Sequence, residues 1–406
     1  MDRRAFMGSL GAYGAVLAGA RAQGTSRAPK LKIREIRAVP IKGIKTHYVR
    51  IYTDQGLTGT GETLDTVGAA DIINKFMGPG LVGRDPLEIE KIYYDLFSYP
   101  NVFLRGNGGG PYMAAISGIE MALWDVAGKA LGLPIYQLMG GKIRDQVPVY
   151  FHNNDEKKVG DFIKSTGVHG IKTQIDYTTA KDNASAGWDP PKICNWTLTN
   201  KQIDNLVAHV AAMRETMGPE TALMLECHTR YDTESALQIC KAMEPYRPAW
   251  VEEPIPPDNV DAMAFIRSHA RVPIASGENV YTRYGYRTYL EKQAVSIIQL
   301  DMAKCGGLWE SRKIMGMAEI YHIPAAPHGV ASRLGIAAYS HVCATVPNLM
   351  CLEWAFYPNP MINSLTKEGA VDYRDGFIHV SDTPGIGVEL NEDAVKEHQL
   401  AGYANL

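Results

Sequence analysis

The chain has 406 residues, of which 46% are hydrophobic and 21% are charged, and its formal net charge is −3. This length suits two domains or one barrel with an added domain, and the near-neutral charge excludes a basic surface that would attract nucleic acid. The six cysteines include no CxxC pair, so neither a disulfide scaffold nor a zinc site is indicated. We expect a globular protein with packed thiols and no nucleic-acid partner.

The first 24 residues form a segment of their own, "MDRRAFMGSLGAYGAVLAGARAQG". Arg3 and Arg4 precede a weakly apolar stretch over residues 6–20, and residues 20–22 have the small-residue pattern of a cleavage site. The stretch is too short and too rich in glycine to span a bilayer. We interpret residues 1–24 as a twin-arginine-type signal for periplasmic export, with no membrane insertion after cleavage. The alternative is a frayed N-terminus of a cytoplasmic protein.

Residues 30–140 have the pattern of a small α+β domain. After a linker at 25–29, three β-rich runs separated by turn residues extend over 31–64 and predict an antiparallel meander. From about residue 67 the pattern becomes helical, and "MAAISGIEMALWDVAGKAL" has a strong 3.6-residue period that closes on Gly132 and Pro134.

Residues 141–360 have the alternating pattern of an α/β barrel. Short apolar runs alternate with helical segments, and most runs end in a polar residue. These residues are His152, Gln174, His228, Glu253, Glu278, Asp301, His328 and Glu353. Eight runs favour a (β/α)8-type barrel, in which active sites lie at the C-terminal ends of the strands. Any one of these residues alone is more simply a loop residue, but together they predict one site.

Glu226, Glu252 and Glu278 follow the third, fourth and fifth runs at intervals of 26 residues. Three converging carboxylates raise one another's pKa unless a cation neutralises them, so a metal ion is implied. Ligation by oxygen alone favours Mg²⁺, with Mn²⁺ as a substitute. In "WVEEP", spacing and strand alternation favour Glu252 as ligand over Glu253, which we expect to face the helical layer or the rim.

Asp301 and His328 end adjacent runs, so a hydrogen bond between them is expected to orient the histidine ring and raise its basicity. In "LMLECHTR", alternation along a strand would direct Glu226 and His228 to the same face. We therefore predict that His328 is a base and that His228 donates a proton beside the metal.

The chain resembles the enolase superfamily, specifically its mandelate racemase subgroup and the galactonate dehydratase-like acid-sugar dehydratases within it. The resemblance rests on "LECH", "WVEEP", "SGEN", "LDMAKCGG" and "PHG" in this order, after "ALWDVAGKALGLPIYQLMGG", and extends from about residue 31 to the end. It implies a modified (β/α)7β barrel over 141–360. It also implies a capping domain made of 30–140 and a returning segment, 361–406, with one Mg²⁺ per subunit.

The resemblance also implies a mechanism. His328, paired with Asp301, would abstract the proton α to the substrate carboxylate, giving a metal-stabilised enediolate. His228 would protonate the departing 3-hydroxyl, and Glu353 would hydrogen-bond the developing enediolate. The expected reaction is dehydration of an aldonate to a 2-keto-3-deoxy acid by a hydro-lyase.

The sequence departs from the racemases of this subgroup at the second barrel strand. They carry a Lys-x-Lys pair whose second lysine is a base, whereas "IKTQ" has Lys172 followed by Gln174, which we assign to substrate binding. Without this second base, dehydration is favoured over racemisation, and Lys172 is expected to stabilise the enediolate by its charge. A racemase, epimerase or cycloisomerase of the same superfamily remains the alternative, and a non-catalytic periplasmic sugar-acid binding protein is a second one.

Substrate identity is not predicted by any spacing rule. The capping loops 40–47 and 98–110 are expected to set specificity, and Arg105 is a candidate contact for a distal hydroxyl or carboxylate of the substrate. The long stretch 176–196 after the second strand either contributes to the site or covers the barrel rim. We expect a small sugar acid as substrate and a homo-oligomer of between two and eight subunits.

Overall fold

The computed structural model describes residues 29–64, 67–98, 109–175, 196–355 and 357–406. Within them, Leu31–Leu406 forms one compact unit. The predicted export signal at 1–24, Arg105 and nearly all of the 176–196 stretch lie outside the described residues.

The capping domain begins with the predicted meander. The strands β1 (Ile33–Pro40), β2 (Thr46–Thr53) and β3 (Thr58–Leu64) pair antiparallel in chain order. The helices that follow are α2 (Ala69–Ile72), the π-helix η1 (Ile73–Met77), α3 (Gly78–Leu81), α4 (Ile89–Phe97), α5 (Gly110–Leu131) and α6 (Ile135–Leu138).

Helix α5 packs directly on β3 because glycines on that strand leave room for the helix backbone. A Cβ built on Gly59 would lie 2.4 Å from the carbonyl oxygen of Ala122, and one on Gly61 would lie 2.3 Å from that of Gly118. The repeated glycines of "TGTGETL" therefore allow a close approach of helix and sheet.

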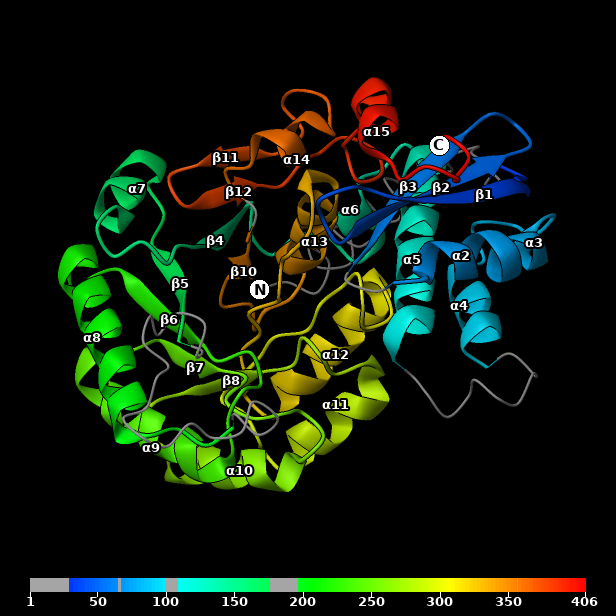
Figure 1. Ribbon diagram of the computed structural model, residues 1–406. Coiled ribbons are helices and arrows are strands. Elements are labelled where there is room, and N and C mark those ends of the chain that lie inside the picture. Colours follow the sequence, from blue (N-terminus) through cyan, green and yellow to red (C-terminus); the bar gives the residue numbers. More distant parts are fainter. Residues whose placement is uncertain (1–28, 65–66, 99–108, 176–195, 356) are drawn as a thin grey trace, which may run out of the picture. The chain divides into compact units, whose positions relative to one another are not determined.

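The barrel alternates strands and helices as predicted, with the helices outside the strands (Figure 1). Its elements are β4 (Gln146–His152), α7 (Val159–Thr166), β5 (Gly170–Gln174), α8 (Asn200–Met217), β6 (Ala222–Glu226), α9 (Thr233–Met243), η2 (Glu244–Tyr246), β7 (Trp250–Glu252), α10 (Val260–His269), β8 (Ile274–Ser276), α11 (Thr282–Glu291), β9 (Ile297–Ile298), α12 (Leu308–Ile320), α13 (Arg333–Ala344) and β10 (Leu352–Glu353). Strands β4 to β9 pair parallel in chain order, and β10 pairs with β4.

The seventh predicted strand, "IPAAPH", is not a regular strand. It contacts its neighbours through isolated parallel bridges that pair Ile298 with Ala325 and Asp301 with His328. Prolines at 324 and 327 lack the N–H that a regular ladder needs, which explains the interruption. The bridges nevertheless set His328 next to Asp301, its predicted partner.

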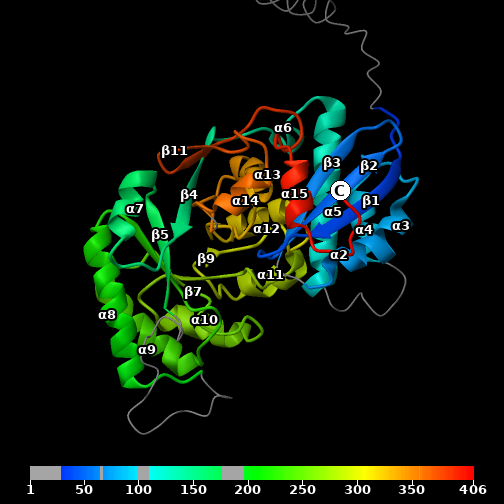
Figure 2. The same ribbon diagram turned by 45° about the horizontal axis from the view of Figure 1, so that its top comes forward.

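The C-terminal segment contains α14 (Pro360–Ser364), the strands β11 (Asp372–Arg374) and β12 (Phe377–His379), and α15 (Glu392–His398). Strand β12 pairs antiparallel with β4. Helix α15 lies beside the capping sheet in both views (Figure 1, Figure 2), where Glu392 forms an ion pair of 2.7 Å with Arg50. The segment thus returns from the barrel to the capping domain.

Two further observations concern the described part of the chain. None of its helices combines the length and apolar character that crossing a membrane requires. Its cysteines, Cys227, Cys240, Cys305, Cys343 and Cys351, are buried free thiols, as predicted, while Cys194 lies outside it.

Candidate active site

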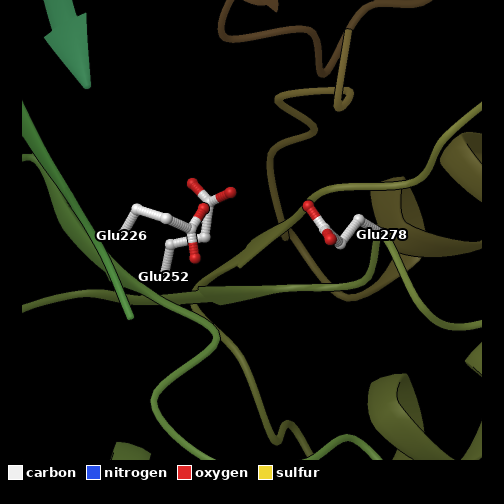
Figure 3. A group of neighbouring side chains, drawn as sticks. All are labelled: Glu226, Glu252 and Glu278. Carbon is white, nitrogen blue, oxygen red and sulfur yellow. The ribbon is translucent and has the colours of Figure 1, made fainter. Parts of the chain in front are cut away.

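The carboxylates of Glu226, Glu252 and Glu278 meet at or just beyond the C-terminal ends of β6, β7 and β8. Strand pairing sets Glu226 opposite Glu252, and one oxygen from each of the three side chains lies within 4.8 Å of the others. Figure 3 shows the carboxylate of Glu278 directed at the other two from the opposite side. The side chains that the regular spacing singled out therefore form a group that could bind a metal ion.

The charge of this carboxylate group is only partly balanced. Burial and the neighbouring charge of Glu252 raise the pKa of Glu226 well above its ordinary value. Lys172 Nζ lies 2.5 Å from Glu252 and 3.1 Å from Glu226. Burial opposes the charge of this lysine, but the surrounding carboxylates keep its pKa well above the ordinary value. Lys172, even together with a protonated His328 beside Glu278, does not balance three carboxylates, so the group retains an affinity for a cation.

Glu252 is held in place from inside the barrel. Its Oε2 accepts hydrogen bonds from Gln299 Nε2 at 2.6 Å and from the indole Nε1 of Trp250 at 2.8 Å. Its Oε1 is the atom that contacts Lys172. These fixed donors orient the carboxylate before any ligand binds.

Glu253 supports the segment that carries Glu278. It is buried and accepts hydrogen bonds from Ser276 Oγ and Asn279 Nδ2, both at 2.8 Å. Asn279 Nδ2 also lies 3.2 Å from Glu278 Oε1. We expected Glu253 to face the helical layer or the rim, but the left-handed turn at this residue, with a φ of 43°, directs its buried carboxylate to the end of β8.

His328 is fixed between two carboxylates. Asp301 Oδ2 lies 2.5 Å from Nδ1, and Asp301 is itself held by the Tyr339 hydroxyl at 3.2 Å and the Ala303 N–H at 2.8 Å. The other ring nitrogen, Nε2, lies 3.0 Å from Glu278 Oε2. Burial opposes protonation, but the charge of Glu278 and the bond to Asp301 raise the pKa of His328 well above its ordinary value. The ring is therefore held in one orientation, with Nε2 directed at the carboxylate group.

His228 does not lie on a strand. Strand β6 ends at Glu226, and His228 has a left-handed backbone with a φ of 50°. The argument from strand alternation is therefore wrong for this residue. Its backbone N–H donates to Glu226 Oε1 at 2.7 Å, so the turn still attaches His228 to the carboxylate group.

Glu353, on β10, lies among positively charged and hydrogen-bonding groups. Its Oε1 is 2.8 Å from Lys172 Nζ, its Oε2 accepts from the N–H of Gly329 at 3.1 Å, and His152 Nε2 contacts Oε1. Burial would raise the pKa of Glu353, but Lys172 and His152 lower it well below the ordinary value. No separate role was assigned to His152 from the sequence. Its position at the end of the first barrel strand is the feature that places it at the site.

The two predicted substrate-binding residues have different outcomes. Gln174 ends β5, where strand pairing sets it opposite Glu226, and its Oε1 accepts from Asn154 Nδ2 at 3.2 Å. It therefore lies beside the carboxylate group. Arg105 lies outside the described residues, so its predicted contact stays a prediction.

Comparison with known families agrees with this geometry. Residues 157–394 match the family model described as enolase C-terminal domain-like. Residues 40–140 match the mandelate racemase/muconate lactonizing enzyme N-terminal domain. The chain belongs to the mandelate racemase/muconate lactonizing enzyme family. The resemblance stated from the motifs is thus confirmed, and with it the barrel with a capping domain.

Relatives in this family have named activities. D-xylonate dehydratase of Haloferax volcanii is 38% identical over 363 residues, which cover 87% of this chain and 85% of that protein. D-galactonate dehydratase of Pectobacterium atrosepticum is 33% identical over 362 residues, covering 86% and 90% respectively. Sugar-acid dehydratases are hydro-lyases, which agrees with the predicted enzyme class.

A similar solved structure is that of a mandelate racemase/muconate lactonizing enzyme-like protein from Rubrobacter xylanophilus. It has a TM-score of 0.84 and 34% sequence identity, and the match covers 93% of this chain and all of that chain. The likeness therefore includes the capping domain as well as the barrel.

Proposed function

We propose that this protein is a Mg²⁺-dependent dehydratase of an aldonate, releasing water to give a 2-keto-3-deoxy acid. The observation that carries the proposal is the placement of His328. One ring nitrogen is held by the buried Asp301, and the other is directed at Glu278 in the carboxylate group. A base oriented in this way suits removal of a proton from the carbon next to a carboxylate.

Glu226, Glu252 and Glu278 fit a hard divalent cation. Their carboxylates supply only oxygen ligands, and two of them are almost fully buried. The bound ion would supply positive charge to the substrate carboxylate and to the enediolate formed from it. Lys172 would add a second positive charge at the same place.

The elimination would use the two histidines for separate proton transfers. His328 takes the α-proton from C2, and the electron pair of that bond forms the enediolate. The C3–O bond then breaks as His228 gives a proton to the hydroxyl, which leaves as water. The resulting enol takes up a proton at C3 and loses its hydroxyl proton, which gives the 2-keto acid.

Gln174 favours dehydration over racemisation. Racemisation needs a second base on the opposite face of the α-carbon, and an amide cannot accept the proton. The remaining lysine on this strand, Lys172, forms ion pairs through Nζ with carboxylate oxygens of Glu226, Glu252 and Glu353, at 3.1, 2.5 and 2.8 Å. The names of the relatives support the same choice and direct attention to D-xylonate and D-galactonate.

The test is a panel of aldonates and aldarates that includes D-xylonate and D-galactonate, with 2-keto acid formation as the readout. We expect turnover of at least one aldonate with Mg²⁺ and none in excess chelator. Glu252→Gln should lose both turnover and the calorimetric signal of Mg²⁺ binding, because it removes a ligand and a charge together.

Glu310→Gln is the matched control, because Glu310 is a buried carboxylate of the barrel that does not belong to the group of Glu226, Glu252 and Glu278. It should retain Mg²⁺ binding. Full turnover in chelator would contradict the metal requirement. Interconversion of 2-epimers without 2-keto acid would instead make the protein a racemase or epimerase, and tight binding without any turnover would make it a binding protein.

A further inference from the structure

A buried carboxylate of the capping domain holds the segment that follows His328. Glu62, on β3, is fully buried, and its Oε1 accepts from the N–H of Ser332 at 2.8 Å. Its Oε2 accepts from the Ser332 hydroxyl at 2.5 Å and from the N–H of Gly335 at 3.0 Å. Ser332 is the N-cap of α13 and lies four residues after His328. Glu62 therefore satisfies N–H groups that have no partner within the helix.

A second capping-domain carboxylate holds the segment that follows Asp301. Glu120, on α5, is buried and accepts from the N–H of Leu308 at 2.7 Å and from that of Trp309 at 3.0 Å. These are the first residues of α12, which follows Asp301 in the chain. The neighbouring Ser117 Oγ accepts from the N–H of Gly306 at 2.9 Å.

Glycines allow both carboxylates to approach the barrel backbone. A Cβ on Gly307 would lie 2.1 Å from Glu120 Oε2, and Gly307 has a left-handed φ of 97°. A Cβ on Gly335 would lie 2.9 Å from Glu62 Oε2. Each contact is thus a close fit between the capping domain and a specific helix N-terminus.

Glu62 also contacts the capping loop that precedes β2. Its Oε1 accepts from Thr46 Oγ1 at 3.0 Å, and Thr46 is the first residue of β2 after the loop that begins at residue 41. One carboxylate therefore connects a loop of the predicted specificity region to the segment of the catalytic base.

We propose that Glu62 and Glu120 are positioning residues that fix His328 and Asp301 from the capping domain. The inference rests on the proposed function for its effect on turnover, but its structural part is independent of it. His328 and Asp301 sit on irregular backbone, joined by an isolated bridge rather than a regular ladder. Their placement therefore depends on where the following helices begin, and the capping domain determines this through the two carboxylates.

The test compares Glu62→Gln and Glu120→Gln with Asp125→Asn. Asp125 is a matched control, because it is also a buried capping-domain carboxylate but accepts from Thr60 and Ile386, and not from α12 or α13. For each variant, kcat, KM and exchange of the α-proton with D₂O are measured. Residue-resolved amide exchange of His328, whose N–H donates to the Leu300 carbonyl at 3.0 Å, is measured as well.

We expect kcat and α-proton exchange to fall by about 10- to 100-fold in Glu62→Gln, since a misplaced base loses rate steeply. KM should change by less than about threefold, because the groups proposed to bind the substrate carboxylate lie at or just beyond the ends of β5 to β8. The His328 amide should exchange at least about tenfold faster. Asp125→Asn should retain kcat and His328 protection, even if its melting temperature falls.

Two results would overturn the inference. One is that both glutamine variants keep the wild-type kcat and the wild-type protection of the His328 amide. The other is that Asp125→Asn loses as much kcat and amide protection as they do. If Glu62→Gln does not fold, Ser332→Ala, which removes only the hydroxyl that Glu62 accepts from, should give a smaller loss in the same direction. If the wild type turns over no aldonate, the proposed function fails, and the amide exchange of His328 still decides the positioning role.

Discussion

At the scale of residues, the proposed reaction assigns different tasks to two histidines. His328 reaches the carboxylate group through Nε2, whereas His228 is attached to it through the backbone N–H that Glu226 accepts. This difference suggests separate tasks, one at the α-proton and one at the leaving hydroxyl. Substitution of each histidine should therefore block a different step.

We predict that His328→Asn abolishes both turnover and exchange of the α-proton with D₂O. His228→Asn should lose turnover by about 10²-fold or more while still forming the enediolate, so deuterium should appear in recovered substrate if His328 exchanges its proton with solvent. The measurement is NMR of recovered substrate and product. Near-normal exchange in His328→Asn would place a second base on the opposite face, with Lys172 as the candidate.

The sequence predicted the residues of the site better than their local backbone. The positions of Glu226 and Glu252 follow from the strand-end rule, because parallel strands of a barrel end at one mouth. The left-handed turn at His228 does not follow from it, because the length of β6 depends on pairing with its neighbours. Glu62 was also missed, since its contact with Ser332 spans 270 residues and leaves no periodic signal.

At the scale of elements, α13 joins the active site to the C-terminal segment. Its N-terminus is capped by Ser332 and Glu62, and His341 near its end donates from Nε2 to the Ile386 carbonyl at 3.1 Å. Nδ1 of this ring is buried and has no hydrogen-bond partner among the described residues. A proton on Nδ1 would therefore be buried without an acceptor.

This arrangement predicts a pH-dependent stability. Burial lowers the pKa of His341 from 6.5 to about 4. A lowered pKa means that the unfolded chain binds the proton first, so this contribution is present above about pH 6.5 and is lost as the pH falls towards 4. At about 1.4 kcal/mol per pH unit, the loss amounts to about 3 kcal/mol.

His341→Gln, whose amide can still donate to Ile386, should remove this part of the decrease in unfolding free energy between pH 6.5 and 4. As a control, substitution of the exposed His322 by Gln should leave the decrease in unfolding free energy unchanged. Urea unfolding of the three proteins across this pH range checks the prediction. Parallel pH curves for wild type and His341→Gln would contradict it.

For the whole molecule, the capping domain and the barrel act as one folded unit. Polar contacts such as those of Glu62 and Glu120 cross from the first domain to the second, and α15 returns to the capping sheet. Such a chain has to be folded completely before its site exists. For an exported protein of this kind, it therefore matters whether folding takes place before or after export.

We predict that the protein is exported to the periplasm already folded and metal-loaded, through the paired arginines Arg3 and Arg4. Folding before export agrees with the five described cysteines, which are buried as free thiols and therefore need no oxidising compartment. Exchange of both arginines for lysine should retain the protein in the cytoplasm, with unchanged activity in lysates because the substitutions lie far from the site in sequence. Fractionation with N-terminal sequencing checks this, since export should also remove about the first 24 residues. Periplasmic accumulation of the double lysine variant, or a native protein that keeps its N-terminus, would contradict the twin-arginine interpretation and leave the enzyme in the cytoplasm.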